Sequence, residues 1–309
     1  MSKADLPKVG PWAADKLERL GKYLAAYTTI MAKQKWWAEG FIFVDAFAGA
    51  GRAVVRGPKP AKGPPNTLLD FETPNEERDP NLERVLDGSP AVALAVNPPF
   101  TEYVFLERDP DRAARLAHLR DEFPDRTIII QQGDSNEFLR SEFITTYDWQ
   151  RWRAIVFLDP FGMQVPWNTL TMLAATKGIE VFINFPVNMA IQRLLKRSAK
   201  FTDKERKKLD DYFGDPGWYD LLYTSEGLFG PQIGKAKDSG TLLMSWYQER
   251  LRAAFGFASP AYLVNATNGH PLYYLIHAGP NENGVRIAGE VLKAGTPIRS
   301  ARRTRSKKS

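Results

Sequence analysis

Cysteine is absent from all 309 residues of the sequence. Its absence excludes disulfides, thiolate nucleophiles, iron–sulfur ligation and cysteine-based zinc sites. Histidine is scarce as well, and the three that occur lie on different segments, at His118, His270 and His277. We therefore expect no metal site in this chain. The lack of cysteine also suits a reducing compartment, so a cytoplasmic protein is expected.

Long apolar runs are missing too. No stretch of the sequence approaches the roughly 20 apolar residues that a membrane-spanning helix needs. The N-terminus carries no apolar segment of the signal-peptide type. No association with a membrane is expected.

Excess charge is confined to one end of the sequence. The formal net charge is +6, and the six arginines and lysines of the tail 299–309 account for all of it, so residues 1–298 are neutral overall. We expect this tail to be a disordered basic arm. It can hold the phosphates of a nucleic acid or act only as a solubilising end, and its composition favours neither role over the other.

The remaining residues, 1–298, are expected to form one domain. Hydrophobic residues make up 43% of the chain, enough for one large α/β core with insertions. A stretch rich in proline, glycine and charge predicts a long loop over 55–87, which could fold over a bound cofactor or substrate. A charged and aromatic segment predicts an insertion over 200–238 near the substrate.

The first element of this domain is expected to be an amphipathic helix over 15–37. Apolar residues recur there every three or four positions, which places them on one face of a helix. The basic residues of the stretch, Lys16 and Arg19 among them, are interpreted as a solvated face, with a binding surface as the less favoured alternative. A second helix is predicted with Ser89 as its N-cap and Pro90 in its first position.

Residues 41–52, FIFVDAFAGAGR, have the pattern of a buried strand that ends in a loop of small residues. A continuous apolar run is typical of a parallel strand covered on both faces, and open α/β sheets bind ligands where such strands end. The loop residues assigned to a cofactor are Asp45, Phe47, Gly49 and Gly51. NAD fits poorly because no third glycine opens a helix directly afterwards. An acid inside the loop suits S-adenosylmethionine (SAM), which presents a sulfonium, an amino group and a ribose diol.

Strands and helices alternate along the following part of the sequence. Four more buried strands are predicted, at 103–109, 127–134, 154–158 and 179–185. Two further strands flank an Asn-Gly turn signal, which predicts an antiparallel hairpin. Right-handed crossovers then give an α/β fold with a doubly wound, Rossmann-like SAM-methyltransferase sheet. It is mostly parallel, with seven strands and a C-terminal antiparallel hairpin.

A carboxylate follows each of the first four predicted strands, and the carboxyl ends of neighbouring strands face one crevice. In this arrangement Asp45 and the glycine loop hold the methionine portion of SAM. Glu107 accepts from the ribose hydroxyls and Asp134 reaches the adenine amine. The residues beside them that complete the expected cofactor set are Arg108, Ser135 and Asn136. Each acid alone is a weak signal, but four successive ones fit a nucleoside cofactor with one cation and many donors.

The most informative motif is DPFG, which comprises Asp159, Pro160, Phe161 and Gly162. Proline fixes φ and has no N–H to satisfy, so the turn presents the Asp159 carboxylate and the Pro160 carbonyl as a stiff pair of acceptors. Such a pair can bind an exocyclic amine and aim its lone pair at a sulfonium methyl, while Phe161 offers a ring for stacking on a planar base. These four residues are predicted to be catalytic. The alternative is a strand-ending aspartate that only caps the next turn.

Taken together, these motifs resemble the three-Cys-motif partner protein (TcmP) family, a group of SAM-methyltransferase-like proteins. The resemblance runs in order from about Lys16 to Leu292 through DAFAGAGR, GSPAVAL, FLERD, GDSN, FLDPFG, FINFP and YLVNATNGHPLYYLIHAG. It implies that a separate partner protein with three cysteines carries any iron–sulfur cluster. DPFG also looks like the catalytic turn of tRNA guanine-N2 dimethyltransferases and is similar to the DPPY turn of amino-methylating DNA and RNA enzymes. Its aromatic ring stands one position earlier than in DPPY, which leaves the substrate base open.

Three functions are therefore weighed. The first is a SAM-dependent methyltransferase acting on an exocyclic nitrogen of a nucleic-acid or nucleotide substrate; a base inside a duplex would have to be flipped out. The second is a non-catalytic, methyltransferase-like accessory protein that binds the cysteine-motif partner. The third is a nicotinamide enzyme, which the missing glycine disfavours. Intact acids at four strand ends favour the first, because a scaffold has no physical need for them.

Overall fold

The computed structural model describes most of the chain. The described residues are 8–10, 12–34, 36–55, 84–186, 191, 194–196, 198–227, 230–233, 239–265 and 271–294. The basic tail 299–309, the turn of the predicted hairpin and most of the predicted loop 55–87 lie outside these ranges.

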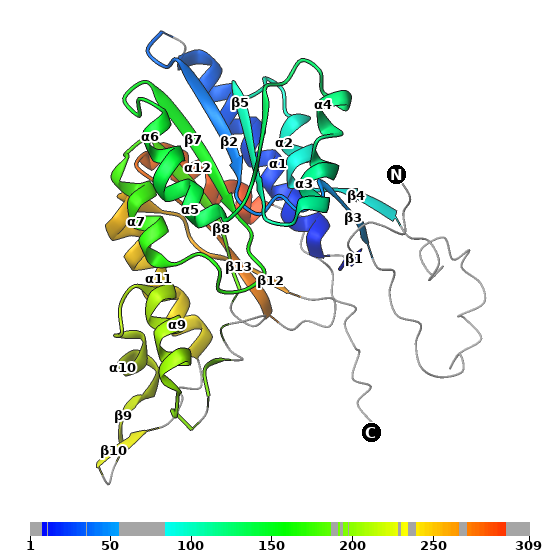
Figure 1. The fold of residues 1–309 in the computed structure, drawn as a ribbon. Helices are drawn as coiled ribbons and strands as arrows, with labels where there is room; N and C mark the ends of the chain where they lie inside the picture. The colour runs from blue at the N-terminus through cyan, green and yellow to red at the C-terminus, as the bar shows by residue number, and fades with distance from the viewer. Residues whose placement is uncertain are drawn as a thin grey trace, which may run out of the picture.

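A mostly parallel sheet forms the centre of the molecule (Figure 1). Its order is β11-β13-β8-β7-β2-β5-β6, with β12 paired to β13, so the described residues contain eight strands of this sheet. β2, β5, β6, β7 and β8 run parallel, and β13 is antiparallel to β8. The strands are β2 (Gly40–Asp45), β5 (Glu102–Glu107), β6 (Ile128–Gln132), β7 (Trp152–Leu158), β8 (Ile179–Phe185), β11 (Phe257–Ala258), β12 (Tyr262–Asn265) and β13 (Pro271–Gly279). The predicted doubly wound sheet with its C-terminal hairpin is confirmed, and β11 is one strand more than expected.

The order of the sheet reverses at β2. β5 pairs with one edge of β2 and β7 with the other, so Asp45 lies beside both Phe105 and Phe157 in register. A strand at which the winding direction changes leaves a crevice at its carboxyl end, because the two connecting helices depart to opposite faces. The first predicted strand is therefore the one that opens the ligand-binding edge.

Two helical layers cover the two faces of the sheet, which explains why the sequence of β2 is a continuous apolar run. All six of its residues are buried. Alternate side chains point to opposite faces, so Phe41 and Phe43 belong to the core under α1, α2 and α12, whereas Ile42 and Val44 belong to the core under α7 and α11. The helices are α1 (Trp12–Met31), α2 (Ser89–Leu94), α3 (Pro110–Leu116), α4 (Leu119–Glu122) and α12 (Glu282–Ala294) on the first face, and α5 (Ser135–Phe138), a π-helix (Leu139–Phe143), α6 (Ile144–Thr146), α7 (Trp167–Ala175) and α11 (Ser239–Phe255) on the second.

Several predicted boundaries need correction. The N-terminal helix begins at Trp12, earlier than expected, and ends at Met31, where a 3-10 helix (Ala32–Gln34) follows. The ends of the predicted loop 55–87 are strands, because β3 (Arg52–Val55) pairs with β4 (Arg84–Asp87) and with β1 (Lys8–Val9) in a small second sheet. Short strands of this kind carry too few residues to show a pattern, and their pairing partners are distant in the sequence.

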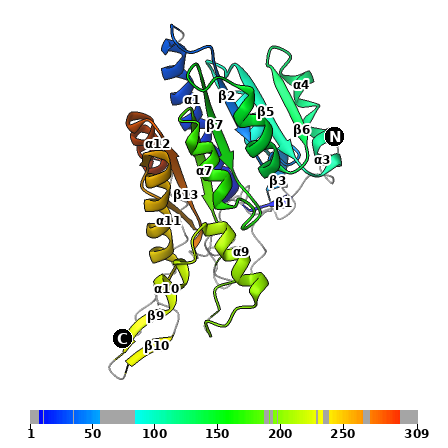
Figure 2. The same cartoon turned by 60° about the vertical axis from the view of Figure 1, so that its left-hand side comes forward.

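The predicted insertion lies beneath the carboxyl edge of the sheet (Figure 2). It comprises α9 (Asp203–Phe213), α10 (Trp218–Tyr223), β9 (Thr224–Gly227) and β10 (Gly230–Ile233). α9 begins with a capping box, in which the Thr202 hydroxyl accepts from the Glu205 amide and the Glu205 carboxylate accepts from the Thr202 amide. It ends at Gly214, whose φ of 66° is left-handed. Among the described residues, no helix is both long and apolar enough to cross a membrane.

Candidate functional site

The loop after β2 is held by the two strands beside it. The Ala46 amide donates to the Phe157 carbonyl (3.1 Å), and the Ala48 amide donates to the Leu106 carbonyl (3.0 Å). Gly49 and Gly51 have left-handed φ values of 63° and 76°, a conformation that other residues adopt only with strain. A Cβ at Gly49 would meet nothing within 4 Å. Glycine is therefore required there by backbone conformation, and the loop faces open space.

Asp45 is a buried carboxylate whose hydrogen bonding is incomplete. Its side chain is fully buried and Oδ1 accepts from the Phe47 amide at 3.1 Å, but Oδ2 is buried without a hydrogen-bond partner. Burial raises the pKa of this carboxyl to about 7. The Ser89 hydroxyl lies close enough to lower this pKa in part. Ser89 makes no capping bond to α2, whose N-cap is Gly88, so the predicted cap instead faces the carboxylate.

A close backbone contact fixes the far end of the same loop. The Gly88 amide donates to the Gly51 carbonyl at 2.8 Å, and a Cβ on Gly88 would lie 2.6 Å from that carbonyl oxygen. The φ of Gly88 is an ordinary −75°. Glycine is needed here because of the approach of two backbones, and the chain conformation alone would accept another residue.

We expect Gly88→Ala to destabilise the protein by about 1–3 kcal/mol, because the added carbon must push the glycine loop away. Thermal unfolding would measure this loss. Gly21→Ala is the matched control, since its Cβ would meet only one Val92 methyl carbon, at 3.1 Å and not a backbone atom, and alanine favours a helix. A Gly88→Ala protein as stable as the control would show that the contact is not restrictive.

The two predicted acids that follow β5 and β6, Glu107 and Asp134, lie at the same carboxyl edge of the sheet as Asp45. The Gly133 amide donates to the Glu107 carbonyl at 3.2 Å, which joins the ends of β5 and β6. Glu107 is half-buried, and its Oε1 accepts from the Asp109 amide at 2.9 Å. Asp134 is exposed and caps α5, accepting from the Asn136 and Glu137 amides. Its predicted contact with adenine stays a prediction.

The remaining cofactor candidates differ in their surroundings. Ser135 is buried and donates to the Ala46 carbonyl, so it links β6 to the glycine loop. Asn136 donates to the Gln164 carbonyl at 2.8 Å, which links α5 to the loop after β7. Phe47 is half-buried and packs against the core under α7 and α11, and Arg108 is exposed. These bonds position the loops of the edge, and the cofactor contacts assigned to these residues stay predictions.

The DPFG turn lies next to Asp45, close enough for the Asp159 charge to raise the pKa of that carboxyl. Asp159 Oδ1 accepts from Asn184 Nδ2 at 2.6 Å, and Oδ2 accepts from Lys16 Nζ. The Pro160 carbonyl accepts from the Gly162 amide at 2.9 Å, and Gly162 has a φ of 97°. Phe161 is 82% exposed, so its ring is free to contact a ligand.

Two residues of this group were missed by the sequence analysis. Lys16 was assigned to a solvated face, which is wrong: its side chain is only 12% exposed and is paired with Asp159. Helical spacing from Ala13 and Leu20 would have placed it on the buried stripe. Asn184, the last polar residue of β8, is buried and has no partner for Oδ1, which is a second incompletely bonded acceptor at the site.

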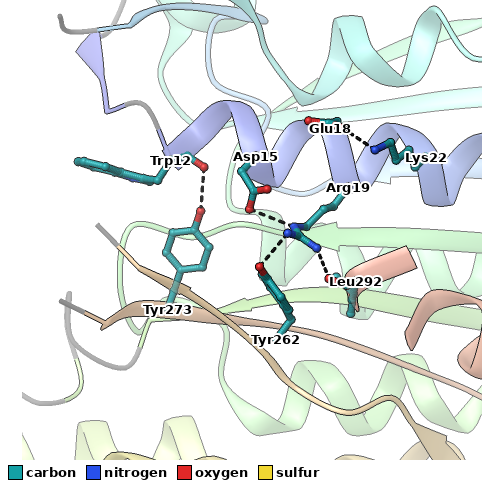
Figure 3. Close-up of polar contacts among 8 residues, drawn as sticks. All are labelled: Trp12, Asp15, Glu18, Arg19, Lys22, Tyr262, Tyr273 and Leu292. Carbon is teal, nitrogen blue, oxygen red and sulfur yellow. Dashed lines mark hydrogen bonds and ion pairs between the residues drawn. The ribbon is translucent and has the colours of Figure 1, made fainter. Parts of the chain in front are cut away.

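The assignment of Arg19 to a solvated face is wrong as well. Arg19 is fully buried and fixes α1 to the C-terminal part of the chain (Figure 3). It donates to Asp15 Oδ2 (3.0 Å), to the Tyr262 hydroxyl (2.8 Å) and to the Leu292 carbonyl. A buried guanidinium needs this number of acceptors, since an unpaired one would cost several kcal/mol. The network holds in place the helix that presents Lys16 to Asp159.

Two hollows on the described surface lie outside this polar group. One of about 300 Å³ is lined by residues of α9 and of the loop after β7, and one of about 370 Å³ lies between α1, α2 and β4. Neither is lined by Asp45 or Asp159. We locate the candidate site by the incompletely bonded acceptors that gather at the carboxyl edge of the sheet, because a buried acceptor without a partner is a position that a ligand can satisfy. Within the described ranges, no three His, Asp or Glu side chains are grouped so that they could hold a metal ion.

Comparisons with known proteins give the fold. No family model and no curated protein matches the chain. The structure of protein LPL1258 from Legionella pneumophila, of the family model DUF519, is similar with a TM-score of 0.50 and 11% identity, over 93% of this chain and 94% of that one. The N-terminal domain of EvdMO1, solved in the presence of SAH and D-fucose, is similar with a TM-score of 0.34 and 9% identity, over 85% of this chain and 83% of that one. The putative methyltransferase YhhF from Escherichia coli is similar with a TM-score of 0.28 and 14% identity, over 53% of this chain and 68% of that one. The chain therefore has a Rossmann-like α/β fold, which its own sheet order gives and the similarity to LPL1258 matches in extent.

Proposed function

We propose that the protein is a SAM-dependent methyltransferase that acts on an exocyclic nitrogen of a nucleic-acid base or nucleotide. One observation carries the proposal. A fully buried Asp45 with an unpartnered carboxylate oxygen stands at the switch point of the sheet, beside an open glycine loop and the DPFG turn. Burying a carboxylate oxygen without a hydrogen-bond partner is unfavourable, so the arrangement is best explained by a cationic or N–H ligand.

The residues present fit SAM. The free Oδ2 of Asp45 would accept from its amino group and lie near its positive charge, and the space outside Gly49 would admit the methionine portion. Glu107 is half-buried at the end of the next strand, where it would accept from the ribose hydroxyls. When bound, SAM supplies a methyl group that is already activated for transfer.

The DPFG turn would hold the substrate amine. The Asp159 carboxylate and the Pro160 carbonyl each have further acceptor capacity besides the bonds they already make, because a carboxylate offers about four lone-pair sites and a carbonyl two. Both would orient the amine, and the Asp159 carboxylate would take up its proton, with the exposed Phe161 ring stacked on the base. Lys16 would hold the Asp159 carboxylate in place through their ion pair.

The resemblance to the TcmP family adds a partner to the proposal. A separate protein with three cysteines, with an iron–sulfur cluster if it holds one, would work beside this chain. The basic tail 299–309 would add affinity for the phosphates of a nucleic acid.

Isothermal titration calorimetry with SAM and with NAD tests the cofactor. We expect SAM to bind and NAD to give no heat beyond dilution. NAD binding, or the absence of any heat with SAM, would contradict the proposal.

One observation favours the non-catalytic alternative. Both carboxylate oxygens of Asp159 are already bonded, to Asn184 and Lys16, as a purely structural aspartate would be. Transfer of radiolabelled methyl from SAM into RNA, DNA and protein pools, with and without the cysteine-motif partner, separates the two functions. Incorporation supports the enzyme, whereas SAM binding without incorporation under either condition supports the accessory role.

A further inference from the structure

One exposed face of α9 borders the hollow of about 300 Å³, which residues of the loop after β7 also line. The hollow is lined by Met163, Pro166, Lys204, Lys207, Lys208, Asp211 and Tyr212. Met163 and Pro166, which line the hollow, belong to the same loop as the exposed Phe161, so the loop that carries this ring forms one wall of the hollow. This surface is not lined by the proposed cofactor residues, and it is defined here as the α9 face.

Helical spacing brings the three lysines of the α9 face together. Positions 204, 207, 208 and 211 are three or four residues apart, so they form one stripe along the helix. Lys207 is paired with Asp211 at 2.6 Å. Lys204 and Lys208 are exposed and have no carboxylate partner in the part of the chain that the structure describes. The stripe therefore carries a surplus of two positive charges.

Two of the three other acids of α9 make contacts that hold the helix, and the third, Asp203, is exposed in its first turn. Glu205 closes the capping box and accepts from Lys196 at 2.6 Å, which together lower the pKa of its carboxyl to about 2. Asp210 accepts from the Trp218 indole at 2.7 Å. These contacts fix the helix in position and leave Lys204 and Lys208 free to meet an anion.

We propose that the α9 face binds the phosphodiester backbone of a single-stranded nucleic acid, with Lys204 and Lys208 on successive phosphates and a neighbouring base on Phe161. The proposal rests on the DPFG turn being the methyl-transfer site of the proposed function. Lysines along a groove beside an exposed aromatic ring are the combination that single strands require, because the cations meet phosphates and the ring stacks on a base. An acidic protein partner would bind to the lysines alone and would not require the exposed Phe161 ring.

The test uses the full chain and a fluorescent 20-nucleotide single strand of mixed sequence, as RNA and as DNA. Binding is followed by fluorescence anisotropy at several KCl concentrations. The variant Lys204→Glu/Lys208→Glu is expected to bind at least about 10-fold more weakly at low salt. The slope of log affinity against log salt is expected to fall in magnitude by about 1.4, since each phosphate contact on a single strand contributes about 0.7.

Lys33→Glu/Lys177→Glu is the matched control. It makes the same change of charge at exposed positions away from the α9 face, after α1 and between α7 and β8. It is expected to bind more tightly than the α9 variant and to keep the salt slope of the wild type. The tail is present in every protein compared, so its contribution is common to all of them.

Phe161→Ala provides an independent readout. Loss of one stacked base is expected to weaken binding by about 5- to 100-fold without changing the salt slope, because stacking releases no counterions. An α9 variant that binds like the wild type, or a wild type that binds neither RNA nor DNA, would overturn the inference. A difference between the RNA and DNA arms identifies which strand the face prefers.

Calorimetry with SAM on the same proteins distinguishes this inference from the proposed function. The α9 variant is expected to bind SAM like the wild type, because its changes lie outside the cofactor residues. If SAM binds while the lysine change has no effect on the strand, the inference is wrong and the cofactor proposal stands. If the wild type does not bind SAM but its binding of single-stranded nucleic acid depends on the two lysines, the inference about the α9 face holds and the proposed function is wrong.

Discussion

Asp45→Asn is expected to abolish SAM binding and, at the same time, to stabilise the free protein at pH 8. Both effects have one cause, the burial of a carboxylate whose Oδ2 has no partner. Asparagine has the same shape but no charge, so the cationic ligand loses its counterion inside the site. Removing one member of a buried charge pair costs about 3–5 kcal/mol, which corresponds to a loss of affinity of at least about 100-fold.

The gain in stability follows from the pKa of the Asp45 carboxyl. Burial raises it to about 7 from the ordinary value of 3.8, so between these values the folded protein binds more protons than the unfolded chain. The stability contributed by this group is fully present below its unfolded pKa and is lost as the pH rises through 7. Asparagine does not titrate, so the variant should gain about 2.5 kcal/mol relative to the wild type between pH 5 and pH 8.

Urea unfolding of both proteins at pH 5 and pH 8, with SAM titration at pH 8, measures these two effects. Asp148→Asn is the control, because it makes the same chemical change at an exposed aspartate beyond the opposite, amino end of β7. It should show neither effect. An Asp45→Asn protein that still binds SAM with the affinity of the wild type would remove the central argument for the cofactor.

Asp159→Asn is expected to leave SAM binding within about threefold of the wild type and to lower methyl transfer by about 100- to 10,000-fold. The asparagine can still bond to Asn184, but it cannot take up a proton from a substrate amine as the carboxylate can. Transfer of radiolabelled methyl into the nucleic-acid pool that the wild type modifies measures the loss. Loss of SAM binding in this variant would show that the division of roles between Asp45 and Asp159 is wrong.

Lys16 complicates this variant, since its side chain is only 12% exposed and its ammonium would lose its carboxylate partner. The cost of that loss is about 1–3 kcal/mol in stability. Asp159→Asn combined with Lys16→Met removes both charges and should recover much of the stability. Methyl transfer should stay low in the double variant, because the missing group is the acceptor itself. Recovery of transfer would mean that the single variant failed only through misfolding.

Local patterns in the sequence were sufficient for the order and type of the sheet strands. A continuous apolar run predicts a parallel strand buried on both faces, and β2 and β8 are buried at every residue. The position of Asp45, the two glycines and DPFG directly after such strands placed them at the carboxyl edge, because parallel strands share one edge for their carboxyl ends. α12 was missed, although Val285, Ala288 and Leu292 repeat at helical spacing on its buried face.

What the sequence by itself determined is therefore the sheet and the acids at its carboxyl edge, since continuous apolar runs mark the strands and the acids stand directly after those runs. Only the tertiary structure decided which of those groups are left unsatisfied. Lys16 and Asp159 are 143 residues apart, and Arg19 reaches a carbonyl 273 residues away. Such pairings depend on how α1 packs against the completed sheet, and no local pattern encodes them. The same packing leaves Asp45 Oδ2 without a partner, because helices that exclude water from the carboxylate supply too few donors to replace it.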